Sequence, residues 1–344
     1  MPGARSGLVP AALLIAACSQ ATQEASGIPP LRTELPRALS SAESRLVTAG
    51  NQLAFDLLRE AQRDQPAGNV FLSPTSAAMA LAMTRNGAAG ATRDSMERAL
   101  RLSGIPDADI NAGYRSLIDL LRGLDRRAEF AIANSIWADA GVSFAPPFLE
   151  SARTGFDAEI RSVDFRAPAT LDAINEWVKN GTGGKIPTIL DAIAPEEVMF
   201  LINAIYFKGA WRTAFDPAKT RPAPFHAADG SVREVPTMHL DPGPLLAGQV
   251  AGHQIVELLY GNGAFAMTLV LPAEGSSPAE ISSGLDAAKW AEWLAALHEV
   301  KLGLTLPRFR LEYRRELKDD LSALGMRIAF DPDHADFSRM RSGG

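Results

Sequence analysis

The chain has 344 residues, of which 47% are hydrophobic and 22% are charged, and this globular composition excludes a short peptide or a disordered chain. Its 34 basic residues stand against 40 acidic residues, which leaves a formal net charge of -6. Such a mild negative charge offers no electrostatic footprint for nucleic acid, so we expect no nucleic-acid partner.

The N-terminus has the pattern of an export signal. An apolar run, Leu8–Ala17, follows Arg5 and is too short to span a bilayer. Small residues then precede Cys18, an arrangement that resembles a bacterial lipobox, in which the cysteine is lipidated. We therefore predict a signal peptide over residues 1–17 and a lipid on Cys18; the alternative is an ordinary cleaved signal with an incidental cysteine. Because Cys18 is the only cysteine, no internal disulfide can stabilise the exported domain.

Residues 18–44 are rich in Ser, Thr, Ala, Gln and Pro and contain few large apolar residues, which is typical of a flexible tether. The remaining residues, 45–344, contain no second linker and suit one domain. We expect an exported protein, either a lipoprotein of the cell envelope or a protein of the extracellular space, whose only membrane contact is the lipid.

Helical periodicity dominates the first part of the expected domain. Apolar residues over Leu46–Leu58 recur at spacings of three and four, which predicts a helix with one apolar stripe. A short apolar strand is expected over residues 69–72, followed by Ser76 as the N-cap of a helix over residues 77–85. Further helices are expected over residues 92–102, 108–124 and 171–180.

Strand patterns dominate the second part. Residues 129–138 alternate apolar and other side chains, whereas residues 198–207 are almost continuously apolar, which predicts a central strand buried on both faces. The apolar runs 254–260 and 264–271 flank Gly261–Gly263, a strong hairpin signal. A strand is also expected over 301–311, and helices over 278–297 and 316–324. Helices gathered before strands favour an α+β fold.

Motifs for catalysis, cofactors and metals are weak. The segment Gly181–Lys185 is superficially like a phosphate loop, but it lacks the glycine and the hydroxyl residue that such a loop needs and it follows a helix. The five histidines have no metal-binding spacing, and no G-x-S-x-G elbow is present. We therefore expect no cofactor, no metal and no enzymatic activity.

Several separated segments resemble the serpin family, in order and at about the expected spacing. They are Asn69–Ser76, Gly87–Thr92, Asn175–Ile186, Leu201–Trp211, Pro236–Met238, Leu306–Phe309, Leu324–Met326 and Ala335–Ser338. The segment Leu201–Trp211, which reads LINAIYFKGAW, resembles a strand of the family's main sheet. The resemblance implies a large mixed central sheet, additional smaller sheets and about eight to nine helices.

The resemblance also implies a mechanism and a set of site residues. In this family a protease cleaves an exposed reactive loop and forms an acyl-enzyme, after which the loop inserts as a new strand into the main sheet. By resemblance, Ser73, Ser76 and Asn203 lie at the shutter beneath the opening strands, and Trp211 lies at the breach where insertion begins. Small hydroxyls and one amide suit a sheet that must exchange hydrogen-bond partners, although Ser76 alone is also explained as an N-cap.

The sequence departs from the family after Ala335–Ser338. There the family continues into the next sheet strand, a shutter histidine, a hinge, the reactive loop and two core strands, whereas this sequence ends with Arg339–Gly344. We expect an incomplete product that cannot inhibit as given. The full-length protein is expected to be a monomeric inhibitor of serine proteases, with cysteine proteases as the alternative target. The alternative is a non-inhibitory binding or structural protein. By resemblance, target specificity is set by the reactive-loop residue that enters the protease's primary pocket.

Overall fold

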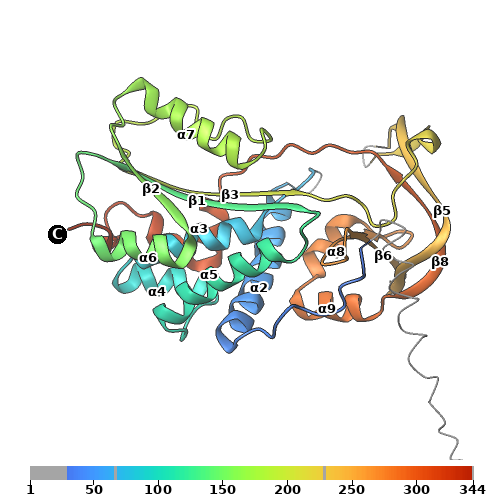
Figure 1. Cartoon of the computed structure of the whole chain (residues 1–344). Coiled ribbons are helices and arrows are strands. Elements are labelled where there is room, and N and C mark those ends of the chain that lie inside the picture. Colours follow the sequence, from blue (N-terminus) through green and yellow to red (C-terminus); the bar gives the residue numbers. More distant parts are fainter. Residues whose placement is uncertain (1–28, 66–67, 228–229, 343–344) are drawn as a thin grey trace, which may run out of the picture.

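The computed structural model of the chain describes residues 29–65, 68–227 and 230–342 (Figure 1). The predicted signal peptide and Cys18 lie outside these residues. The helices within them are α2 (Ser41–Asp64), α3 (Pro74–Asn86), α4 (Gly90–Ala99), α5 (Asp107–Gly123), α6 (Pro146–Phe156), α7 (Pro168–Gly181), α8 (Pro278–Gly284), α9 (Ala287–Ala295) and α10 (Lys318–Leu321). The strands are β1 (Glu129–Asp139), β2 (Ala158–Val163), β3 (Met199–Lys208), β4 (Arg221–His226), β5 (Val232–Val250), β6 (His253–Tyr260), β7 (Phe265–Leu271) and β8 (His298–Pro307). The expected α+β class is confirmed.

The first sheet has the strand order β2-β1-β3 and is mixed, because β1 pairs parallel with β2 and antiparallel with β3. Figure 1 shows α7 above this sheet and α3, α5 and α6 below it. The strands are buried on both faces: Ile132 and Ile136 pack towards the lower helices, whereas Trp137 and Ile202 pack against α7. This double burial explains the almost continuous apolar character of β3.

The second sheet has the order β4-β5-β6-β7, with β8 pairing to β5. The expected hairpin forms between β6 and β7, where Gly261 and Gly263 adopt φ values of +45° and +85° that glycine accepts without strain. Trp293 and Ile255 form a small core where α8 and α9 cover this sheet.

The folded part of the chain begins earlier than residue 45. A capping box starts α2: the Ser40 hydroxyl accepts a hydrogen bond from the Glu43 N–H (3.2 Å), and the Glu43 carboxylate accepts one from the Ser40 N–H (2.7 Å). Arg37 donates two further hydrogen bonds to Glu43. Residues 29–44, expected in the tether, therefore belong in part to the folded domain.

The expected strand over residues 69–72 is wrong. These residues have no ladder partner among those described, and Phe71 is 61% exposed. Helix α3 begins at Pro74, a residue suited to the first helical position, so Ser73 and not Ser76 occupies the N-cap.

The apolar pattern of β3 predicted a central strand, and this prediction is wrong for the described residues. Within them β3 is an edge strand, and its sheet has three strands. The chain leaves β8 at Pro307 and continues in extended form, without ladder pairing, to α10. The helices expected over residues 278–297 are confirmed as α8 and α9.

The charge of Glu43 gives the fold a measurable dependence on pH. The hydrogen bonds from Arg37 lower the pKa of Glu43 from 4.5 to about 2, although burial acts in the opposite direction. Because the folded-state pKa is depressed, the charged pair stabilises the protein above about pH 4.5, and this stability is lost as pH falls towards 2.

We predict that the wild-type protein loses about 2 kcal/mol more unfolding free energy between pH 5 and pH 2 than Glu43→Gln does. Urea unfolding at stepped pH measures the difference. Parallel pH profiles of the two proteins would show that the Arg37 pair contributes nothing to the fold.

Candidate functional site

A chain of polar contacts connects α3 to the first sheet. The Ser76 hydroxyl donates to the Asn203 carbonyl on β3 at 3.3 Å. The Asn203 side-chain amide donates to the Asn134 Oδ1 on β1 at 2.6 Å, and the Asn134 amide donates to the Phe156 carbonyl at 2.6 Å. Ser76, Asn134 and Asn203 are called the shutter cluster below.

One acceptor in the shutter cluster has no partner. The Oδ1 atom of Asn203 is buried and accepts no hydrogen bond within the described part of the chain. Its orientation follows from its neighbours: Phe156 fixes the Asn134 amide, so the Asn134 oxygen must face the Asn203 amide. A buried carbonyl without a donor costs about 1–3 kcal/mol, which leaves the cluster ready to accept a donor.

The four residues expected at the shutter and breach do not form one site. Ser76 and Asn203 are in contact through the hydrogen bond from the Ser76 hydroxyl to the Asn203 carbonyl. Ser73 is exposed, and its side chain makes no capping hydrogen bond. Trp211 lies beyond the end of β3, where its ring stacks on Tyr260 with centroids 4.2 Å apart and planes 17° apart. The strand β3 therefore connects two separate clusters.

Asn134 was not expected in the site, although the sequence carries a signal for it. It is the amide among the alternating apolar residues of β1, and it is 2% exposed. Asn175 of α7 was also not expected. Its side chain exchanges three hydrogen bonds with the backbone of Ile189 and Leu190 and so holds the connection from α7 to β3.

The outer edge of β3 differs from that of β4. Pro222 on β4 faces Pro236 on β5, and two prolines cannot exchange N–H bonds, so the ring nitrogen of Pro222 points to the free edge. Pro224, two residues on, points the same way, and the edge of β4 is thereby protected from strand addition. By contrast β3 contains no proline, and its outer edge has no ladder partner among the described residues.

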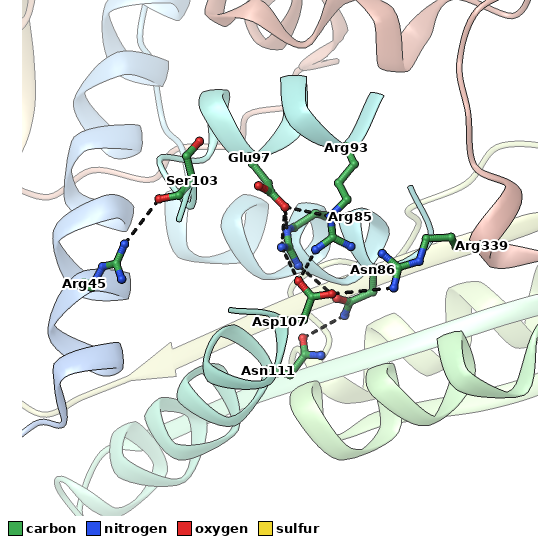
Figure 2. A network of polar contacts seen from close by, with 9 residues as sticks. All are labelled: Arg45, Arg85, Asn86, Arg93, Glu97, Ser103, Asp107, Asn111 and Arg339. Carbon is green, nitrogen blue, oxygen red and sulfur yellow. Dashed lines mark hydrogen bonds and ion pairs between the residues drawn. The ribbon is translucent and has the colours of Figure 1, made fainter. Parts of the chain in front are cut away.

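A buried ionic network holds α3 in place beneath β3 (Figure 2). Arg85, at the C-terminal end of α3 and 1% exposed, bonds Glu97 of α4 at 2.6 Å and Asp107 of α5 at 2.7 Å. Arg93 of α4 contacts the same two carboxylates, and Arg339 lies 3.8 Å from Asp107. Burial raises the pKa of Asp107, but the two arginines outweigh it and lower the pKa below its usual value. Three helices are thus tied together at the end of α3.

We predict that Arg85→Met lowers the unfolding free energy by about 2 kcal/mol, because it removes the hydrogen bonds that a buried guanidinium donates to two partly exposed carboxylates. Arg98→Met, at an exposed position on the neighbouring α4, should change it by less than about 0.5 kcal/mol. Urea unfolding measures both. Equal effects of the two substitutions would contradict a structural role for the network.

The Asn134 and Asn203 side chains are predicted to stabilise the sheet as a pair. A double-mutant cycle of Asn134→Ala and Asn203→Ala should give a coupling free energy of about 1 kcal/mol. Additive losses of stability would show that their hydrogen bond contributes nothing.

The described residues hold no group of three or more His, Cys, Asp or Glu side chains arranged to bind a metal. None of their helices is both long and apolar enough to cross a membrane.

Comparison with known proteins gives concordant results. A family model for serpins, described as serine protease inhibitors, matches residues 48–344. Serpin A3-5 of Bos taurus is 31% identical over 290 residues, which cover 83% of this chain and 70% of that protein. The leukocyte elastase inhibitor of Bos taurus is 34% identical over 307 residues, or 86% of this chain and 80% of that protein.

The fold agrees with these relatives. The solved structure of tengpin, a thermophilic serpin in the latent state, has a TM-score of 0.80 at 29% identity and covers 89% of this chain and 81% of its own. The family model spans most of the chain, and both relatives exceed 30% identity over more than two thirds of their length. This chain therefore belongs to the serpin family.

Proposed function

We propose that the protein is a suicide-substrate inhibitor of serine endopeptidases that acts by inserting a cleaved reactive loop beside β3. The observation that carries this proposal is the unpaired outer edge of β3, a strand without proline whose faces are both covered. About five of its ten residues direct their N–H and C=O groups outward. Pairing them adds about ten hydrogen bonds, together worth about 5–15 kcal/mol.

The shutter cluster supports the same proposal. A sheet that parts and closes needs side chains whose hydrogen bonds can be exchanged without leaving buried groups unsatisfied. The free Oδ1 of Asn203 supplies an acceptor at the middle of β3. In the family, the strand after the Ala-Asp-Phe-Ser segment brings a shutter histidine, and its ring N–H is a suitable donor for this oxygen.

The strand next to β3 and the reactive loop are proposed to belong to a segment outside the present sequence. Residues 308–317 run extended without ladder pairing, and Arg314 ties them to Asp191 and Ile189 in the connection before β3. The Tyr313 hydroxyl is buried without a partner in the described structure. An additional strand between β3 and this segment would pair the edge of β3.

We further propose attachment to the cell envelope through a lipid on Cys18, which would place the inhibitor where it meets proteases that reach the cell surface. Among possible targets, elastase-like serine proteases are the first to test, because the leukocyte elastase inhibitor is a relative of this chain.

The inhibitory function is tested by mixing proteases with two proteins: the present chain, and a longer product that continues through the downstream coding sequence. We expect the longer product to form a covalent complex with an elastase-like protease that survives denaturant, and the present chain to be cleaved or ignored. Simple degradation of the longer product by elastase-, trypsin- and chymotrypsin-like proteases would favour a non-inhibitory serpin. A genuine stop codon after Gly344 in a soluble native protein would refute the proposed missing segment.

The anchor is tested separately by Cys18→Ala. We expect the wild-type protein in the membrane fraction of the producing cell and the variant in the soluble fraction. Fractionation that does not change with the substitution would refute lipidation at this residue.

A further inference from the structure

A cleft of about 710 Å³ lies where the described chain begins. The segment Pro29–Glu34 forms one wall, the connection Gly123–Arg127 after α5 forms the second, and Asn262 in the β6–β7 turn forms the floor. The cleft lies beyond the C-terminal end of β3, because Arg212, the residue after Trp211, contacts the Pro29 wall. No residue of the shutter cluster lines it.

The walls of the cleft are held together by specific contacts. The Arg32 N–H donates to the Asn262 carbonyl at 2.7 Å, and the Arg212 guanidinium donates to the Pro29 carbonyl at 2.8 Å. The second wall is tied to the same turn, because the Asp125 carboxylate accepts from the Asn262 N–H at 2.8 Å and the Asn262 amide donates to the Leu124 carbonyl at 2.9 Å. The cleft is therefore a formed site.

Two cationic side chains in the cleft are uncompensated. Arg32 is half-buried, and its Nε–H is buried without an acceptor, while Arg126 is exposed and makes no side-chain hydrogen bond or ion pair within the described residues. Two acidic residues also line the cleft. Asp125 is 4% exposed and uses its carboxylate on backbone N–H groups, and Glu34 is exposed at the rim. An anion bound in the cleft would compensate the positive charges of Arg32 and Arg126.

The position of the cleft relative to Cys18 suggests which anion is available. Cys18 precedes Pro29 by eleven residues, so the two residues lie at most about 40 Å apart. A lipid on Cys18 would hold the cleft near the headgroups of the same membrane, where phosphates are present at an effective concentration of millimolar or more. At this concentration even a site of low affinity would be occupied. Each basic residue near anionic lipid adds about 1 kcal/mol to the free energy of membrane binding.

We propose that this cleft binds the phosphate of an anionic phospholipid headgroup through Arg32 and Arg126 and so fixes the orientation of the tethered domain on the membrane. Pro29, Pro30 and Leu31 provide an apolar wall beside the bound headgroup. The inference rests on the proposed anchor at Cys18, not on protease inhibition.

The test couples the chain that begins at Cys18 to vesicles through this residue, which is the only cysteine and therefore reacts alone with a maleimide lipid. Amide hydrogen exchange is then compared on vesicles of phosphatidylcholine with and without phosphatidylglycerol. We expect exchange in residues 29–34 and 123–127 to slow by about three- to tenfold on the anionic vesicles, as site occupancies of about 70–90% would give.

Matched variants separate the cleft from general electrostatics. Arg32→Gln with Arg126→Gln should abolish the protection, whereas Arg98→Gln with Arg166→Gln, which remove the same charge at exposed positions outside the cleft, should preserve it. The proposal would be overturned by equal amide exchange on the two kinds of vesicle. It would also be overturned if both double variants lost the protection to the same extent. Protection by inorganic phosphate on pure phosphatidylcholine, without a further effect of phosphatidylglycerol, would assign the site to free phosphate and overturn the lipid assignment.

Maleimide coupling replaces the natural lipid in this experiment. The outcome at the cleft can therefore be told apart from a failure of lipidation in the cell, which membrane fractionation of Cys18→Ala reports.

Discussion

Within the described residues the strand β3 is covered on both faces yet paired on one side only, and much of the remaining structure depends on this constraint. Backbone N–H and C=O groups that cannot reach water need partners, so an apolar strand with a free ladder edge strongly favours addition of another strand. The edge of β4 is blocked by Pro222 and Pro224, whereas no comparable device protects β3. The difference supports the proposal that a strand is added at the edge of β3.

The helices on the two faces of β3 support its proposed role in strand addition. The ionic network around Arg85 fixes the end of α3, while Ser76 of the same helix reaches the Asn203 carbonyl of β3. On the opposite face, Asn175 holds the connection from α7 to β3. These contacts hold the layers below and above β3 and support the proposal that this sheet changes through strand pairing.

Much of the fold could be predicted from residue patterns. The periodicity over Leu46–Leu58, the alternation in β1 and the glycines of the β6–β7 turn each have a local physical cause, and each element formed as expected. The family was also recognisable, because LINAIYFKGAW and the other motifs recur in order. Strand boundaries next to prolines were harder to predict: Pro74 starts a helix, and no strand precedes it among the described residues.

The site was less predictable, because it depends on contacts between distant segments. The pairing of Asn134 with Asn203, the burial of Arg85 and the free Nε–H of Arg32 follow from packing that no local pattern encodes. The helix α6 and the strands β2, β4 and β5 were not expected either. The capping box Ser40–Glu43 was present in the sequence but lies in a stretch whose polar composition resembles a tether.

The most direct test of this account is residue-resolved amide hydrogen exchange along β3 in the present chain. If its outer edge is free, the amides of Met199–Lys208 should alternate, with those bonded to β1 exchanging at least about tenfold more slowly than those directed outward. In a longer product that supplies the neighbouring strand, both sets should be slow. Uniform protection of all of these amides in the present chain would contradict the account, because it would show that the edge of β3 is already paired.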